Sequence, residues 1–168
     1  MNFEDLATTK KGRIGEQIVA AEFTKNGYVV YPAPPNTSEH FDMYAFGLKE
    51  CYLVECKVVC RLAVQPVVSV DLNDLPRYIH AEQVANKPLL IYWVDVFEQC
   101  IYASSLTNFR SVCTPNKRQA KAQIHLKYTK FIRWLTLEEC RKVGNPTDRY
   151  EGVTRWFNDI MALTQKRL

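Results

Sequence analysis

Residues 52–59 read YLVECKVV, an apolar, β-branched stretch that contains one acid and one base. Side chains of a strand point alternately to its two faces, so Glu55 and Lys57 share one face while Val54 and Cys56 point to the other. Burying charges in this way is costly unless they are paired or bind an ion. The stretch therefore predicts a buried strand whose acid and lysine form an ion pair or part of a functional site.

A second acid, Asp42, has a similar apolar setting within residues 41–46. Residues 47–50 are long enough to turn the chain into a hairpin, which would bring Asp42 close to Glu55. Two carboxylates beside an ammonium group suit a hard cation such as Mg²⁺, which proteins usually hold through one or two carboxylates. A structural salt bridge inside the sheet is the alternative interpretation of the same three residues.

Hydrophobic periodicity predicts an α/β arrangement around this hairpin. Helices are expected at residues 12–26, 73–86, 105–113, 136–143 and 148–165. Strands are expected at residues 28–31, 41–46, 51–59, 67–70, 88–95 and 101–103, with one or two more within 124–135. Residues 114–121 are polar and are expected to form a loop.

The length of 168 residues is that of one domain, and no repeat or low-complexity tract divides it. We expect a single domain over residues 1–168, with a core at about residues 10–103 and a C-terminal extension at about residues 104–168. No apolar run approaches the ~20 residues of a membrane helix, and residues 1–11 contain no signal-like apolar segment. Six cysteines without a CxxC pair favour free thiols. These features predict a cytoplasmic protein with no membrane partner.

Positive charge is concentrated in one segment. Residues 99–137 contain seven Lys or Arg and no Asp or Glu, whereas the other 129 residues carry 15 basic and 18 acidic side chains. Aromatic residues are interleaved with these charges, a combination that suits a polyanion such as nucleic acid. The alternative is a solvated basic face. The basic residues expected to contact nucleic acid are Arg110, Lys117, Arg118, Lys121, Lys127 and Lys130, together with Lys11 and Arg13 at the start of the first helix.

Three short motifs occur in a distinctive order. They are GRIGE at residues 12–16, Phe41-Asp42 and VECK at residues 54–57, followed by the helix and strand of residues 73–95. This order resembles the PD-(D/E)XK nuclease superfamily, in particular its junction-resolvase-like and homing-endonuclease-like branches. The resemblance implies an α/β, restriction-endonuclease-like core (helix, three-strand mixed sheet, helix, strand) with a C-terminal basic α+β extension. Phe41 stands where the family pattern has proline.

The resemblance also implies roles for four residues. Asp42 and Glu55 would bind Mg²⁺, for which Mn²⁺ can substitute, and Lys57 would assist the attacking water. Glu16 of the GRIGE motif would add a third acid to the metal site. A solvated helix glutamate is the alternative for Glu16, because nothing in its neighbourhood alone marks it out.

These expectations combine into a metal-dependent endonuclease that hydrolyses DNA, duplex or branched, with a Mg²⁺-activated water. One active centre per chain suggests a homodimer or higher symmetric oligomer for cutting two strands. Two alternatives stay open. The chain can be a nuclease-like module that binds nucleic acid without cutting it, or a protein-interaction domain with an incidental ion pair.

Overall fold

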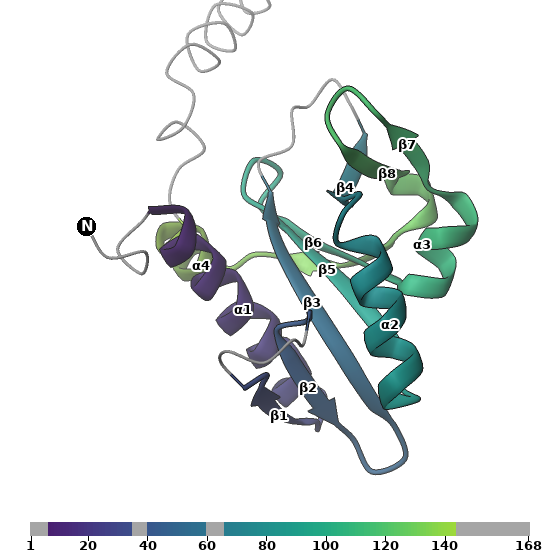
Figure 1. The fold of residues 1–168 in the computed structure, drawn as a ribbon. Helices are drawn as coiled ribbons and strands as arrows, with labels where there is room; N and C mark the ends of the chain where they lie inside the picture. The colour runs from purple at the N-terminus through teal and green to yellow at the C-terminus, as the bar shows by residue number, and fades with distance from the viewer. Residues whose placement is uncertain (1–6, 35–39, 60–65, 144–168) are drawn as a thin grey trace, which may run out of the picture.

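The structure is a computed structural model that describes residues 7–34, 40–59 and 66–143 (Figure 1). In this part of the chain a six-stranded mixed sheet lies between helices. Its strands follow the order β1-β2-β3-β5-β6-β9. Their bounds are β1 Val29–Pro32, β2 Met43–Phe46, β3 Cys51–Val59, β5 Leu89–Asp95, β6 Cys100–Ser105 and β9 Lys130–Trp134.

A smaller sheet and the helices complete the fold. The second sheet has the order β4-β8-β7, with β4 Val67–Asp71, β7 Thr114–Asn116 and β8 Lys121–His125. The helices are α1 Ala7–Lys25, α2 Leu75–Ala85, α3 Leu106–Val112 and α4 Leu137–Val143, with a 3₁₀ turn, η2, at Leu126–Tyr128. Strands β3 and β5 are parallel, and every other adjacent pair is antiparallel. The predicted α/β class with a mixed sheet is confirmed.

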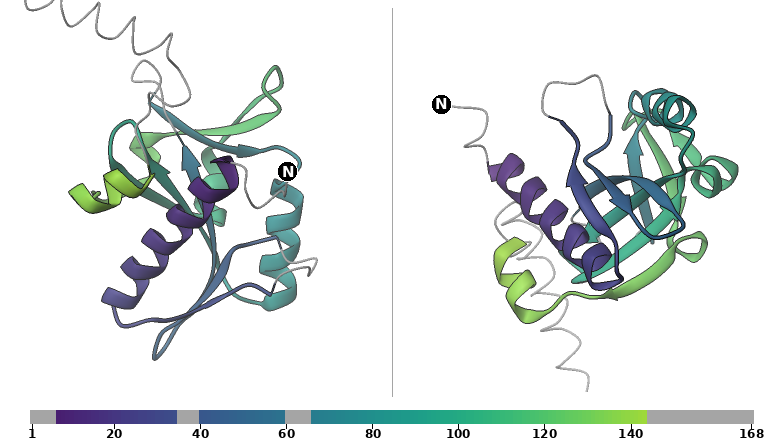
Figure 2. Two further views of the ribbon diagram at one scale, coloured as in Figure 1. Left: turned by 90° about the vertical axis from the view of Figure 1, so that its left-hand side faces the viewer. Right: turned by 90° about the horizontal axis from the view of Figure 1, so that it is seen from below.

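Strand β3 separates two apolar layers. Helix α1 lies on one side of it, and α2 with the smaller sheet lies on the other (Figures 1 and 2). Val54 and Cys56 join the layer under α1, whereas Leu53 joins the layer that contains Tyr78 of α2. The alternation predicted for residues 52–59 is therefore present, and it sends the Glu55 side chain toward α2.

Gly15 allows α1 to lie directly on β3. A Cβ atom at this position would overlap Cγ2 of Val58 and touch Sγ of Cys56. The packing of α1 against β3 thus explains why glycine stands at position 15, the second glycine of the GRIGE motif. Any side chain here would push the helix away from the sheet. Close approach of α1 also brings the next residue, Glu16, toward the hairpin.

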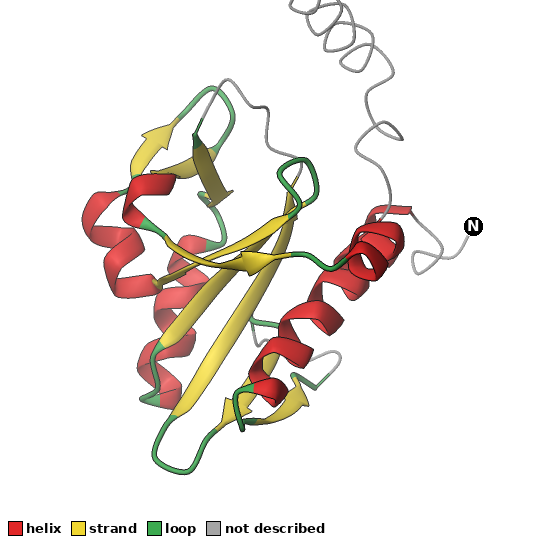
Figure 3. Ribbon diagram, turned by 180° about the vertical axis from the view of Figure 1, so that it is seen from behind, coloured by secondary structure: helices red, strands yellow, loops and turns green. Residues whose placement is uncertain are grey.

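The order helix, three strands, helix, strand is present as α1, β1 to β3, α2 and β5, with β4 inserted before α2. The main sheet is larger than the predicted core, because β9 from the C-terminal segment pairs with β6 at its edge (Figure 3). A capping box at Thr136 begins α4, within the helix predicted at residues 136–143. The hydroxyl of Thr136 accepts from the backbone N–H of Glu139, and the Glu139 carboxylate accepts from the N–H of Thr136 at 2.7 Å.

Two local predictions were wrong. Residues 114–121 are not a loop throughout, because Thr114–Asn116 pairs with β8 and extends the smaller sheet. The polar sequence gave no alternation to detect, and the buried residues Ala122 and Ile124 of β8 organise the pairing instead. Helix α1 begins at Ala7, earlier than residue 12. The predicted helix at residues 148–165 lies outside the described residues.

The sequence predictions about membrane helices and cysteines can be compared with the described residues. Within the described ranges no helix is long and apolar enough to cross a membrane. The cysteines in these ranges are all free thiols, as expected, namely Cys51, Cys56, Cys100, Cys113 and Cys140.

Candidate active site

The β2–β3 hairpin brings Asp42 to Glu55, as predicted. Met43 pairs with Val54, so the preceding residue Asp42 lies opposite Glu55. The Asp42 backbone N–H donates to the carbonyl of Val54 at 2.9 Å, and its side-chain Oδ2 accepts from the N–H of Cys56 at 2.7 Å. The Asp42 carboxylate is thereby fixed against the strand that carries the second acid.

Glu55 is 6% exposed and meets two donors. Lys57 Nζ lies 2.7 Å from its Oε1, and the hydroxyl of Tyr78 donates to the same oxygen at 2.8 Å. Lys57 also lies 3.4 Å from Oδ2 of Asp74 at the start of α2. The acid and lysine of β3 therefore form a partly buried ion pair that two side chains of α2 complete.

The two carboxyl groups influence each other's protonation. Burial raises the pKa of Glu55 to about 7, and the negative charge of Asp42 adds to this effect, while Lys57 and Tyr78 oppose it. Burial also raises the pKa of Asp42, against the hydrogen bond from Cys56, the charge of Lys57 and a hydrogen bond with Glu55. Two acids close enough to share a proton form a site where a cation can replace that proton.

Glu16 lies on the other side of Asp42. Burial raises the pKa of Glu16, the charge of Asp42 raises it further, and Arg13 lowers it. Glu16, Arg13 and Asp42 line one open groove of about 480 Å³ between α1 and the start of β2. The four residues expected to be catalytic thus occupy one region, with Asp42 between Glu16 and Glu55.

The donor set suits a hard cation, because Asp42 and Glu55 offer carboxylate oxygens from adjacent strands. Across residues 7–34, 40–59 and 66–143, however, no group of three or more His, Cys, Asp or Glu side chains is gathered closely enough to hold a metal ion. The ammonium group of Lys57 balances the charge of Glu55 in this arrangement. The arrangement brings Asp42 and Glu55 together as a pair of carboxylates, and Glu16 does not complete a three-ligand group with them among the described residues.

The sequence prediction missed Asp74 and Tyr78. They lie four residues apart, at the start of α2, and so project from the same side of the helix. The hydroxyl of Tyr78 is 3.3 Å from Oδ2 of Asp74. Their spacing was visible in the sequence, but the orientation of that helix side toward Glu55 depends on how α2 packs against β3.

The predicted nucleic-acid-binding residues fall into separate places. Arg13 lines the groove beside Glu16. Lys117 and Arg118 are exposed in the turn between β7 and β8. This turn lies near the site, because the N–H of Leu72, two residues before Asp74, donates to the carbonyl of Ala120 at 2.9 Å.

The remaining basic side chains have other surroundings. Lys121 pairs with Asp71 at 2.7 Å, and Lys127 lies over the Tyr128 ring. Arg110 is exposed on α3, and Lys11 is half-buried on α1. Arg133, which contributes to the positive charge of residues 99–137, forms ion pairs within the fold (below).

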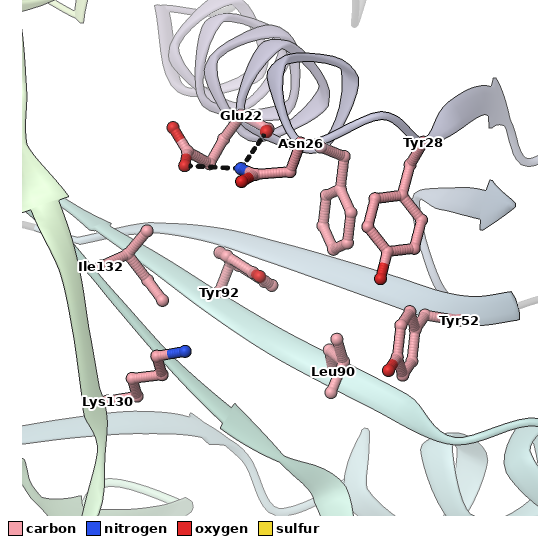
Figure 4. Close-up of a pocket in the computed structure, with 9 residues that line it drawn as sticks. Glu22, Asn26, Tyr28, Tyr52, Leu90, Tyr92, Lys130 and Ile132 are labelled. Atoms are coloured by element: carbon pink, nitrogen blue, oxygen red, sulfur yellow. Dashed lines mark hydrogen bonds between the residues drawn. The ribbon is translucent and has the colours of Figure 1, made fainter. Parts of the chain in front are cut away.

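Lys130 belongs to a second cavity, of about 420 Å³, on the α1 face of the sheet (Figure 4). Its walls include Tyr28, Tyr52 and Tyr92. Because β5 and β6 separate β9 from β3, Lys130 is roughly 14 Å or more from the ion pair of β3. The structure therefore does not bring all of the predicted basic residues to the carboxylates.

Arg133 links α1 to α4. Its guanidinium lies 2.6 Å from Glu22 and 2.7 Å from Glu139. Glu22 also accepts a hydrogen bond from Asn26 at the edge of the second cavity (Figure 4). This cluster has a structural role, since both acids and the guanidinium are mutually engaged.

No family model matches the sequence, and a search of curated proteins finds no match. The fold is similar to a solved structure of Hjc, a Holliday junction resolvase from the archaeal hyperthermophile Archaeoglobus fulgidus. The TM-score is 0.57 with 10% sequence identity, and the match covers 73% of this chain and 92% of that chain. At this identity the likeness concerns the fold alone, and the fold of this chain is similar to that of this Holliday junction resolvase.

Proposed function

We propose that this protein is a metal-dependent DNA endonuclease that hydrolyses phosphodiester bonds with water. The observation that carries this proposal is the meeting of two carboxylates, the buried one of Glu55 and the half-buried one of Asp42, beside the ammonium group of Lys57. A partly buried cluster of this kind is costly to maintain for stability alone. Its residue types and order along the chain also match the nuclease pattern described above.

Each residue has a definite part in this reaction. Asp42 and Glu55 would hold Mg²⁺ or Mn²⁺, with Glu16 orienting the site from α1. The bound ion would supply an acidified water and offset charge on the scissile phosphate. Lys57 would hold the attacking water and offset the charge developing on the phosphate. The water oxygen bonds to phosphorus and the bond from phosphorus to one sugar oxygen breaks. The proton lost by the water passes to solvent, and the leaving sugar oxygen takes a proton from solvent to become a hydroxyl group.

Duplex or branched DNA is the proposed substrate. Support comes from the basic residues near the site, Arg13, Lys117 and Arg118, and from the fold likeness to a protein described as a Holliday junction resolvase. Cutting both strands of a duplex or a junction requires two active centres. We therefore propose a homodimer or a higher symmetric oligomer as the active form.

The test is cleavage of supercoiled, linear and four-way-junction DNA by the full chain in Mg²⁺, with Glu55→Gln as the inactive variant. Loss of a ligand should lower the rate at least about 100-fold. Glu138→Gln is the matched control, because it removes an exposed carboxylate on α4. Cleavage by Glu55→Gln at the rate of the unaltered chain would contradict the proposal.

The second candidate is a module on the same fold that binds nucleic acid without cutting it. Its support is the engagement of Lys57 by both Glu55 and Asp74, together with the lack of a closed three-ligand cluster among the described residues. DNA affinity unaffected by EDTA, without cleavage in Mg²⁺ or Mn²⁺, would favour this candidate.

A further inference from the structure

We propose that Asp74 and Tyr78, at the N-terminal end of α2, are positioning residues of the active site. Tyr78 orients the carboxylate of Glu55, and Asp74 orients the ammonium group of Lys57. This inference rests on the proposed nuclease function and extends the site from the β2–β3 hairpin to α2.

The side chain of Asp74 does not make the contact that its position favours. Asp74 is the N-cap residue of α2, and aspartate there commonly accepts a hydrogen bond from a backbone N–H of the first turn. Its carboxylate makes no such bond. Oδ2 instead lies 3.4 Å from Lys57 Nζ and 3.3 Å from the Tyr78 hydroxyl. Local helix stabilisation is thus replaced by contacts with the site.

Arg77 gives Asp74 its other contact. Its guanidinium lies 3.8 Å from Oδ1 of Asp74 and is itself largely exposed. One oxygen of the aspartate therefore faces the surface and the other faces the lysine of β3. This orientation suits a residue that fixes Lys57 without closing the site to solvent.

Tyr78 acts on Glu55 through a single buried contact. The residue is 2% exposed, and its hydroxyl donates to Oε1 of Glu55 at 2.8 Å. Lys57 reaches the same oxygen at 2.7 Å. Because both donors contact Oε1, they hold the carboxylate in place and neither of them occupies Oε2. Partners of this kind orient metal ligands in proteins.

The contacts form a closed ring from Lys57 through Glu55, Tyr78 and Asp74 back to Lys57. Lys57 also lies 5.8 Å from the centre of the Tyr78 ring. The closed set of contacts joins β3 to α2, so it fixes the position of Lys57 relative to Glu55. If the bond to Glu55 served only to satisfy the Tyr78 hydroxyl, removing this hydroxyl would change the stability of the protein and leave its metal affinity unchanged.

Tyr78→Phe and Asp74→Asn test this role in the full chain. We would measure kcat and KM for DNA cleavage, and, without DNA, the Mn²⁺ dissociation constant by electron paramagnetic resonance of free Mn²⁺. Each variant should lower kcat about 10- to 100-fold with KM changed by less than about threefold, and Tyr78→Phe should weaken Mn²⁺ binding about 10-fold. Asp74→Glu, which keeps the charge, should recover part of the loss seen with Asp74→Asn.

Two matched controls separate positioning from folding. Tyr92→Phe removes the hydroxyl of another buried tyrosine, in the layer under α1, and Glu138→Gln neutralises an acid in the first turn of α4. Both should keep kcat and Mn²⁺ affinity within about twofold of the unaltered chain.

The outcomes distinguish this inference from the proposed function. If the unaltered chain cuts DNA and both variants keep kcat and Mn²⁺ affinity within about twofold, the positioning role is overturned and the nuclease function stands. If the chain binds Mn²⁺ but cuts no DNA, the nuclease function fails, and the Mn²⁺ affinity of Tyr78→Phe still decides the role of Tyr78. If it neither binds Mn²⁺ nor cuts DNA, both proposals fail.

Discussion

The backbone N–H of Cys56 donates a 2.7 Å hydrogen bond to Oδ2 of Asp42 and so ties this acid to the strand that carries Glu55. The bond has two consequences. It satisfies a backbone donor inside the hairpin, and it fixes the spacing of two carboxylates that would repel each other when both are ionised. Asp42 is therefore expected to contribute both to the stability of the hairpin and to the proposed reaction.

Substitutions at Asp42 should separate these two roles. Asp42→Ala leaves the N–H of Cys56 without its acceptor and should destabilise the protein by about 1–3 kcal/mol. Asp42→Asn keeps an oxygen acceptor and should change stability by less than about 1 kcal/mol. Both variants should lose at least about 100-fold in cleavage rate. Urea unfolding beside a cleavage assay measures the two effects, and an active Asp42→Asn protein would argue against a ligand role.

Gly15 should tolerate no side chain where α1 crosses β3. Gly15→Ala places a Cβ against Val58 and should destabilise the protein by about 1–3 kcal/mol, since the crowded core has to shift. Gly12→Ala is the matched control, because nothing lies within 4 Å of a Cβ there. It should be neutral or stabilise by up to about 1 kcal/mol.

Adding Val58→Ala to Gly15→Ala should recover part of the lost stability, because it removes the methyl groups that the new Cβ meets. Thermal unfolding of the two single variants and the double variant measures this. If the losses of stability of the two single variants simply add in the double variant, the Cβ introduced by Gly15→Ala does not clash with Val58.

Strand β3 and the elements that contact it show which features could be predicted from the sequence. Residues 51–59 were predicted with the observed bounds, because alternation and β-branched residues are local properties. The hairpin contact of Asp42 with β3 followed from the short turn. The contact of α2 with Glu55 could not be predicted in the same way, because it depends on how α2 packs against β3 and not on a local pattern in the sequence.

Acid pH should weaken the cluster that links α1 to α4. The hydrogen bond from Arg133, opposed in part by burial and aided by the N–H of Thr136, lowers the pKa of Glu139 to about 2 from 4.5. A lowered pKa means that the stabilisation is complete above pH 4.5 and is lost as the pH falls toward 2. Solvent screening limits the effect to about 1 kcal/mol.

Urea unfolding from pH 6 to pH 2, roughly the range over which this carboxylate titrates, measures the effect. Glu139→Gln should show a shallower loss of stability across this range, whereas Glu138→Gln on the same helix should follow the unaltered chain. Parallel curves for all three proteins would mean that Glu139 contributes no pH-dependent stability.

The turn between β7 and β8 should contribute to DNA binding. Lys117→Gln combined with Arg118→Gln should weaken binding to all sequences alike and lower the slope of log Kd against log salt concentration by up to about 1.8, that is, about 0.9 per phosphate contact. Lys142→Gln is the control, because Lys142 lies on α4 and pairs with Glu138. Fluorescence anisotropy over a range of KCl concentrations gives the slopes, and an unchanged slope would place the DNA elsewhere.

The basic segment illustrates the limit of reasoning from composition. Residues 99–137 do carry excess positive charge, but Arg133 and Lys121 are engaged by acids from distant parts of the chain, and Lys130 lines a cavity on the α1 face. Charge along a sequence does not reveal which side chains are neutralised in the fold. Lys117 and Arg118 are the stronger candidates for DNA contact, because a backbone hydrogen bond from Leu72 to Ala120 joins their turn to the segment that leads into α2.

The most direct measurement is a crystal structure of the full chain soaked with Mn²⁺, with the ion located by anomalous scattering. We expect one peak in contact with carboxylate oxygens of both Asp42 and Glu55, with Lys57 beside it and Glu16 nearby. A Mn²⁺-soaked crystal with no peak between these two acids, or with the ion bound elsewhere, would contradict the account.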